Sequence, residues 1–308
     1  MAVLAKKPEK IVGKQMSFKE SAPYYFLIAP FLIMFILFTV LPILASLVLS
    51  FFNFDMIKTL EFNGLDNYVR LLVGDDIFMT TVKNTLVFAI ITGPAGFLLA
   101  FVLAWFINEF SPFIRTLLSF MFYCPSLVGN AYFIWQVAFS NDSYGYINSA
   151  LLSMGFIQEP IYWLSNAQYL PTIIIIVQLW QSMGVSFLSN ISGLQNVNGE
   201  LYEAGAIDGI RSRWQELWYI TLPAMQHMLL FSAVMQIASA FSVSAIAVQM
   251  AGYPSVNYCV DTIVSYLSDV GGTRYEMGYA SAMSVVLFLM MALSRSLIKK
   301  LINGLGND

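Results

Sequence analysis

Charged side chains are scarce in this sequence of 308 residues. Asp, Glu, Lys and Arg together make up 11% of it, whereas soluble domains carry roughly 25%. Apolar residues reach 58%, and the mean hydropathy is +0.70. A water-soluble chain of this length could not hide so much apolar surface. The composition therefore excludes an ordinary soluble fold and predicts that lipid is the solvent of most of the chain.

Basic charge, cysteine and histidine are also in short supply. The formal net charge of −3 lacks the basic excess that a nucleic-acid partner requires. Neither Cys124 nor Cys259 has another cysteine or a histidine at metal-binding spacing, so we expect both to be small apolar packing residues. The one histidine, His227, begins an apolar stretch and is expected at the membrane interface. The sequence predicts neither a metal site nor a catalytic residue.

Several stretches without a charged residue are long enough to cross a membrane. A hydrocarbon core of about 30 Å needs roughly 20 apolar residues in a helix. The predicted spans are residues 24–49, 85–107, 116–139, 170–194, 225–248 and 277–293. We therefore predict an all-α fold, a polytopic bundle of about six transmembrane helices. The first span has no small-residue cleavage site after it, so we expect it to be retained.

Lysine and arginine are distributed unevenly between the connections. With the N-terminus inside, the inward segments hold Lys6, Lys7, Lys10, Lys14, Lys19, Arg115, Arg211, Arg213, Arg295, Lys299 and Lys300. The outward segments hold only Lys58, Arg70, Lys83 and Arg274. This bias predicts that both termini are cytoplasmic. We expect a cytoplasmic tail at 1–23, a transmembrane domain at 24–301 and a second cytoplasmic tail at 302–308.

Polar residues inside the spans mark a candidate substrate pathway. Lipid rejects unpaired polar groups, so such residues line a pathway or contact another helix. A serine can also bond to its own helix, and a tryptophan can simply pack. The candidates are Gln178, Gln181, Gln236, Ser239, Ser242 and Trp135. No charge lies at the centre of a span, which argues against an ion-coupled carrier and for a neutral substrate.

The long inward connection, residues 195–222, carries a short predicted helix. Apolar residues recur there at every third or fourth position, which is helical spacing. Asn198 is a suitable N-cap, and Gly209 can end the helix in a left-handed conformation. The small residues 204–206 would let another protein approach the backbone closely. A helix lying on the lipid surface fits the same pattern.

This connection resembles a known motif. Glu203-Ala204-Gly205-Ala206-Ile207-Asp208-Gly209, followed by Ile220-Thr221-Leu222-Pro223, resembles the EAA loop of bacterial ABC importer permeases. Phe62-Asn63-Gly64-Leu65-Asp66-Asn67-Tyr68, Asn84-Thr85-Leu86, Tyr144-Gly145-Tyr146-Ile147-Asn148, Leu179-Trp180-Gln181-Ser182-Met183-Gly184 and Gly278-Tyr279-Ala280-Ser281-Ala282 resemble further segments of carbohydrate permeases, in the expected order. The resemblance covers residues 24–300. It points to the maltose-type, CUT1-like group and to its F-type subunit.

The resemblance implies an ABC type I importer permease fold in the bacterial cell membrane. It implies a subunit that translocates a carbohydrate, with an oligosaccharide as the expected substrate. The implied partners are a second homologous permease, an ATPase dimer that binds ATP and Mg, an extracytoplasmic binding protein, the sugar and membrane lipid. The chain has no Gly-x-x-x-x-Gly-Lys loop, so it is not expected to be an enzyme. The coupling residues implied are Glu203, Ala204, Gly205, Asp208 and Gly209.

The sequence departs from the family pattern at both candidate sites. Gly205 stands where alanine is usual, and the small-residue character of the motif survives this change. Residues 240–244 read Ala-Phe-Ser-Val-Ser instead of Ser-Phe-Gln-Val-Phe, in a region that helps line the sugar site of relatives. The identity of the sugar therefore stays open. An ABC permease for another solute, such as glycerol phosphate or a peptide, is one alternative. A secondary transporter and an intramembrane enzyme are others.

Overall fold

The computed structural model describes residues 18–57 and 59–304. Most of the predicted N-terminal tail, Lys58 and the last residues of the predicted C-terminal tail therefore lie outside the described residues. The chain divides into two compact units, residues 1–48 and 49–308. Each unit is described by itself below.

The described part of the first unit is one apolar helical segment, which continues to Leu49 at the start of the second unit. It runs through α1 (Phe18–Phe35), the π-helical turn η1 (Ile36–Val40) and α2 (Leu41–Leu49). Pro42 follows the π turn, where the Leu41 N–H reaches back to the Ile36 carbonyl. The wider turn makes room for a proline that cannot join the regular helical ladder. The span Tyr24–Leu49 is long and apolar enough to cross a membrane.

The second unit holds the remaining elements. In chain order they are β1 (Phe52–Asn53), β2 (Glu61–Phe62), α3 (Asp66–Val69), η2 (Arg70–Gly74), α4 (Asp76–Asn108), α5 (Pro112–Leu127), α6 (Phe133–Ala138), α7 (Tyr146–Ser153), α8 (Leu170–Gln181), α9 (Val185–Asn196), α10 (Gly199–Ile207), α11 (Arg213–Glu216), η3 (Leu217–Thr221), α12 (Leu222–Ala224), α13 (Gln226–Phe241), α14 (Ser244–Ala251), η4 (Val256–Tyr258), α15 (Ile263–Gly272) and α16 (Met277–Gly304). The two short strands pair antiparallel, with Phe52 opposite Phe62.

Most predicted spans correspond to long apolar helices. Four segments among the described residues are long and apolar enough to cross a membrane: Tyr24–Leu49, Asp76–Asn108, Gln226–Ala251 and Met277–Leu297. A fifth is formed if α8 and α9, which meet at a bend of 41°, make one broken span. The all-α prediction is confirmed in its essentials, because the only strands described are two residues long.

The predicted span at 116–139 is not one continuous helix. Helix α5 ends at Leu127, and α6 begins only at Phe133. Pro125 removes a hydrogen-bond donor from the last turn of α5, and Gly129-Asn130 lies in the break. The uncharged run concealed this interruption, because hydropathy does not register backbone breaks.

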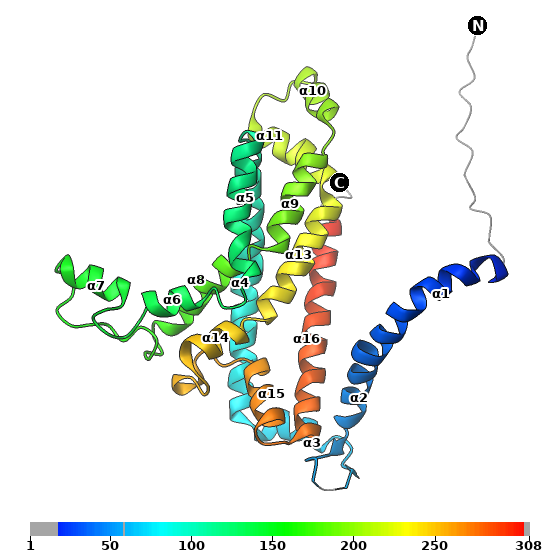
Figure 1. The fold of residues 1–308 in the computed structure, drawn as a ribbon, viewed down its shortest axis with the longest axis vertical. Helices are drawn as coiled ribbons and strands as arrows, with labels where there is room; N and C mark the ends of the chain where they lie inside the picture. The colour runs from blue at the N-terminus through cyan, green and yellow to red at the C-terminus, as the bar shows by residue number, and fades with distance from the viewer. Residues whose placement is uncertain (1–17, 58, 305–308) are drawn as a thin grey trace. The chain divides into compact units, whose positions relative to one another are not determined.

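Within the second unit, α4, α9 and α13 pack closely against one another. Helix α4 runs along the unit, with α10 and α11 at one end and α3 and α15 at the other (Figure 1). Gly96 of α4 makes the close approach possible, because a Cβ there would overlap the Gln236 amide of α13. A small residue at the contact lets helix backbones approach closely in lipid.

A carboxylate fixes the start of α4 to two other helices. Asp75 caps α4 by accepting the Phe78 N–H at 2.8 Å. Its other oxygen accepts the hydroxyl protons of Tyr266 at 2.6 Å and Tyr279 at 2.7 Å, from α15 and α16. Burial alone would raise the pKa of Asp75, but these hydrogen bonds and the nearby Arg70 guanidinium lower it below its usual range. This carboxylate therefore ties α4, α15 and α16 together while it is ionised.

Candidate functional site

Both ends of the predicted inward helix lie where the sequence places them. Helix α10 begins at Gly199, and the Asn198 side chain accepts the Glu200 N–H at 3.1 Å. At the other end the Ile210 N–H bonds to the Gly205 carbonyl at 2.9 Å, and Gly209 has a φ of +94°. This is the Schellman arrangement, which needs a left-handed residue directly after the helix. The predicted cap residues Asn198 and Gly209 are both confirmed.

Gly205 faces the chain itself rather than an outside surface. It is buried, and a Cβ at this position would lie 2.6 Å from Ile220 Cδ1 and 3.1 Å from Ile210 Cδ1. A hydrogen bond of 2.9 Å between Tyr202 and Thr221 joins the same two elements, α10 and η3. The glycine therefore lets α10 pack on η3. The small residue at this position thus makes room for the chain's own Ile220, and the coupling role of Gly205 stays a prediction.

The other predicted coupling residues lie on the surface. Glu203, Ala204, Asp208 and Gly209 are all exposed. Beside them Ile207 is 87% exposed, although it is a large apolar side chain. Helix α10 thus presents an apolar and acidic face that no described residue covers.

An anchor that the sequence analysis missed holds the following loop to α4. Arg213 forms ion pairs with Glu109 at the end of α4, at 2.9 Å, and with Glu216 at 3.0 Å. The rings of Trp105 and Trp214 lie 5.3 Å apart. The Arg213–Glu109 ion pair and the tryptophan contact each join residues more than a hundred positions apart, so spacing along the chain contains no signal for them. They connect the α10 loop to the longest helix of the unit.

Two of the predicted pathway residues pair between helices. Gln178 of α8 donates to the Ser239 carbonyl at 2.9 Å and to its hydroxyl at 3.2 Å. Gln236 of α13 donates to the Ser182 hydroxyl at 2.9 Å. Gln178 and Gln236 are 4% and 1% exposed. Of the two alternatives left open for these amides, the structure shows the interhelical contact.

Two helix breaks meet at a single polar hollow. Residues 182–184 separate α8 from α9, and residues 242–243 separate α13 from α14. Both breaks line a pocket of about 280 Å³, which we call the inner hollow. Its polar lining includes the predicted residues Gln181, Ser239 and Ser242 together with Ser126, Ser182 and Ser186. Irregular backbone at membrane depth is tolerated where it is buried in protein or lines a water-filled cavity, and broken helices of this kind form substrate sites in transporters.

Gln181 is the most informative side chain of the inner hollow. Its carbonyl oxygen is buried and has no hydrogen-bond partner among the described residues. A buried amide oxygen left unpaired costs about 1–3 kcal/mol, so this atom is suited to a ligand or water donor. Trp135, by contrast, lies outside the hollow. Its ring packs against Trp180 at 5.7 Å and Phe139 at 6.0 Å, which places it in apolar packing.

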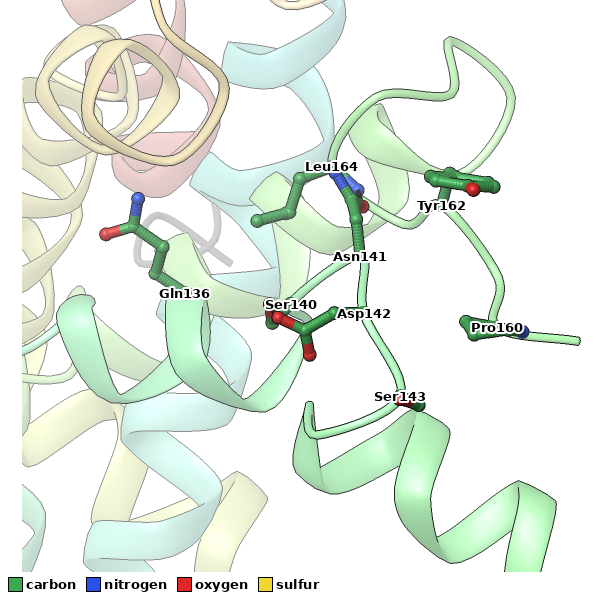
Figure 2. Close-up of a pocket in the computed structure, with 8 residues that line it drawn as sticks. All are labelled: Gln136, Ser140, Asn141, Asp142, Ser143, Pro160, Tyr162 and Leu164. Carbon is green, nitrogen blue, oxygen red and sulfur yellow. Dashed lines mark hydrogen bonds between the residues drawn. The ribbon is translucent and has the colours of Figure 1, made fainter.

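A larger hollow lies beside α6 and the loop that follows it. It has a volume of about 620 Å³, and Figure 2 shows Gln136 on one side, Pro160 and Tyr162 on the other, and Asn141 and Asp142 between them. The Asp142 carboxylate is already engaged, because it accepts the Tyr144 and Gly145 N–H groups. The carboxylate that lines this hollow is therefore less available to a ligand than the unpaired amide of the inner hollow. Among residues 18–57 and 59–304, no group of three His, Cys, Asp or Glu side chains could hold a metal ion.

Comparison with known proteins places the chain in a family. Residues 92–305 match the family described as binding-protein-dependent transport system inner membrane component. The chain is 32% identical over 284 residues to the probable ABC transporter permease protein YesP of Bacillus subtilis (strain 168), covering 89% of this chain and 88% of that protein. It is 30% identical over 288 residues to the arabinooligosaccharides transport system permease protein AraP of the same strain, covering 93% and 90%.

A solved structure shows the same fold. A chain in the crystal structure of a bacterial alginate ABC transporter, in complex with an alginate pentasaccharide-bound periplasmic protein, superposes with a TM-score of 0.74 at 23% identity. The superposition covers 92% of this chain and 96% of that chain. The family match extends over more than half of the sequence, and the long apolar helices agree with it. The chain is therefore a multi-pass membrane protein that belongs to the family of binding-protein-dependent transport system inner membrane components.

Proposed function

We propose that the chain is the permease subunit of an ATP-driven importer for a neutral oligosaccharide. The observation that carries this proposal is the meeting of two helix breaks at the inner hollow. The polar lining of the hollow consists of hydroxyl and amide groups beside the apolar Val185, Met235 and Ala238, and among the described residues no charged side chain lines it. Such groups form hydrogen bonds with sugar hydroxyls and offer nothing to balance an ionic charge. The likeness to AraP, named for arabinooligosaccharide transport, supports a saccharide over other solutes.

Energy for transport is supplied by separate subunits in this proposal. An ATPase dimer binds ATP and Mg and docks on the exposed face of α10, through Glu203, Ala204, Asp208 and Gly209. Gly205 acts by keeping α10 seated on η3. The seat on η3 and the Arg213–Glu109 ion pair connect α10 to the spans, so that a displacement of the helix also moves α4 and α13. The chain itself hydrolyses nothing.

The proposed orientation places α10 in the cytoplasm of a bacterial cell. The transmembrane domain, residues 24–301, then lies between two cytoplasmic tails, 1–23 and 302–308. The opposite end of the second unit, with α3 and α15, faces the extracytoplasmic binding protein (Figure 1). The solved alginate transporter was captured together with a periplasmic protein, which supports such a partner. A second, homologous permease completes the pathway within the lipid bilayer.

The decisive test uses the assembled transporter in vesicles. The chain is reconstituted with its partner permease, the ATPase and the binding protein, and the uptake of labelled arabino-oligosaccharides is measured with and without ATP. Gln181→Leu removes the unpaired amide of the inner hollow and should lower uptake about tenfold, as expected for the loss of one or two ligand hydrogen bonds. Gln168→Leu is the matched control, because Gln168 is exposed in an outward loop and lines no hollow described above. Uptake that needs no ATP would contradict the proposal.

A further inference from the structure

A second polar hollow lies next to the inner one. It has a volume of about 510 Å³ and is formed by α14, α15 and the chain around them; we call it the outer hollow. Its polar lining includes Ser242, Gln249, Tyr253, Ser268, Asp269 and Thr273. The two hollows have Ser242 in common, at the break between α13 and α14. The two hollows therefore adjoin at this residue.

The chemistry of the outer hollow suits a neutral ligand. Its acidic residue, Asp269, is already paired with Arg274 at 2.7 Å, so the pair presents little net charge. The remaining polar groups are hydroxyls and one amide, and they alternate with the apolar side chains Ala245 and Val248. Sugars present the same mixture of hydroxyl groups and apolar C–H faces. Among the described residues, the buried hydroxyl of Tyr253 has no hydrogen-bond partner. The Tyr253 hydroxyl is protonated at neutral pH, and burial raises its pKa further above that range.

The sizes of the hollows indicate the length of the ligand. Small-molecule sites usually measure about 300–1,000 Å³. The inner hollow, at about 280 Å³, lies at the lower limit of that range, whereas the outer hollow, at about 510 Å³, lies well inside it. A ligand that occupies both must be longer than either hollow.

We infer that the outer hollow is a second saccharide subsite, continuous with the inner hollow at Ser242, so that one oligosaccharide occupies both during transport. This inference rests on the proposed function, because it assumes that a sugar enters the inner hollow. It assigns Gln249 and Ser268 to the binding of the second part of that sugar. The outer subsite selects for chain length, whereas the inner hollow accepts any sugar that the binding protein delivers.

The test compares long and short homologues of one sugar. Arabinobiose and longer arabino-oligosaccharides are offered to the complete transporter in vesicles, and kcat/KM for uptake is measured for each. The ratio compared is kcat/KM for the long homologue divided by kcat/KM for the short one. The double variant Gln249→Ala, Ser268→Ala should lower this ratio by about fivefold, as expected for one or two lost hydrogen bonds. Since the binding protein is the same in both preparations, a change in this ratio must come from the permease. Ala245→Phe, which fills the outer hollow with a ring, should lower the ratio further.

Controls separate the inference from the proposed function. Ala292→Phe introduces the same ring on an exposed alanine of α16 that lines neither hollow, and it should leave the ratio unchanged. An unchanged ratio in the double variant and in Ala245→Phe, with uptake intact, would overturn the outer subsite while leaving the proposed function standing. Failure of the native transporter to take up any sugar would instead overturn the proposed function. Quantifying the inserted protein corrects each rate for loss of folded transporter.

Discussion

The seat of α10 on η3 can be tested by filling the space at Gly205. Gly205→Val adds a branched side chain where even a single Cβ would lie 2.6 Å from Ile220 Cδ1. Carbon atoms in favourable contact lie about 3.5–4.0 Å apart, so one of the two side chains must move. Valine and glycine differ in helix propensity by only a few tenths of a kcal/mol, so the steric effect dominates. We expect α10 to be displaced from η3.

The magnitude follows from the packing of the two elements. Inserting bulk into a well-packed contact costs about 1–3 kcal/mol. Ile220→Ala alone should cost about 2–5 kcal/mol, because it leaves a cavity under α10. In the double variant the valine occupies part of that cavity. The combined cost should therefore fall short of the sum of the single costs by about 1–3 kcal/mol, the coupling expected between residues in contact.

Hydrogen exchange of the α10 amides in the solubilised complex measures this local stability. A cost of 1–3 kcal/mol corresponds to exchange that is about 5 to 150 times faster. ATP-driven uptake should fall in Gly205→Val and recover in part in the double variant. Gly199→Val is the matched control, since a Cβ at Gly199 meets nothing within 4 Å. If the double variant exchanged its α10 amides as fast as Gly205→Val does, the contact with Ile220 of η3 would not be the reason for a glycine at position 205.

Three further predictions concern other parts of the second unit. The pKa of Asp75 is lowered in the folded chain, so its carboxylate stabilises the fold at neutral pH. This contribution is lost as the pH falls below about 4. In Asp75→Asn, Tm should therefore decrease less between neutral pH and pH values below about 4 than it does in the native chain. Asn190 is fully buried, and neither the oxygen nor the nitrogen of its side-chain amide has a hydrogen-bond partner among the described residues. Asn190→Leu should therefore leave Tm unchanged or raise it. A decrease of more than about 2 kcal/mol in the free energy of unfolding would show that the amide has a partner. Arg213→Ala breaks only exposed ion pairs, which are worth at most about 1 kcal/mol. Trp214→Ala removes the ring contact with Trp105. Amide hydrogen exchange in α11 should therefore be faster in Trp214→Ala than in Arg213→Ala.

Local signals in the sequence predicted α10 correctly because capping is a local interaction. Asn198 bonds two residues ahead of itself, and Gly209 adopts its left-handed conformation directly after the helix. The partner of Gly205 could not be predicted in the same way. A small residue on a helix shows that something approaches closely, but Ile220 lies fifteen positions further along the chain.

Hydropathy located the spans but not their irregularities. The uncharged run that predicted a span at 85–107 begins only after Lys83, whereas α4 starts at Asp76, where Asp75 caps it. Conversely, the run at 116–139 continues through a break in the backbone. The pairing of Gln178 with Ser239 joins positions 61 residues apart, so only the folded chain shows which amides face another helix and which face the inner hollow.

The central claim is that α10 projects into the cytoplasm and docks on an ATPase subunit. The most direct measurement labels Ile207→Cys with a membrane-impermeant maleimide, in a chain whose own cysteines are replaced by Cys124→Ser and Cys259→Ser. Ile207 is 87% exposed, so its cysteine should react quickly in sealed inside-out vesicles that lack the ATPase and slowly once the ATPase is bound. Reaction from the extracytoplasmic side, or equal rates with and without the ATPase, would contradict the account.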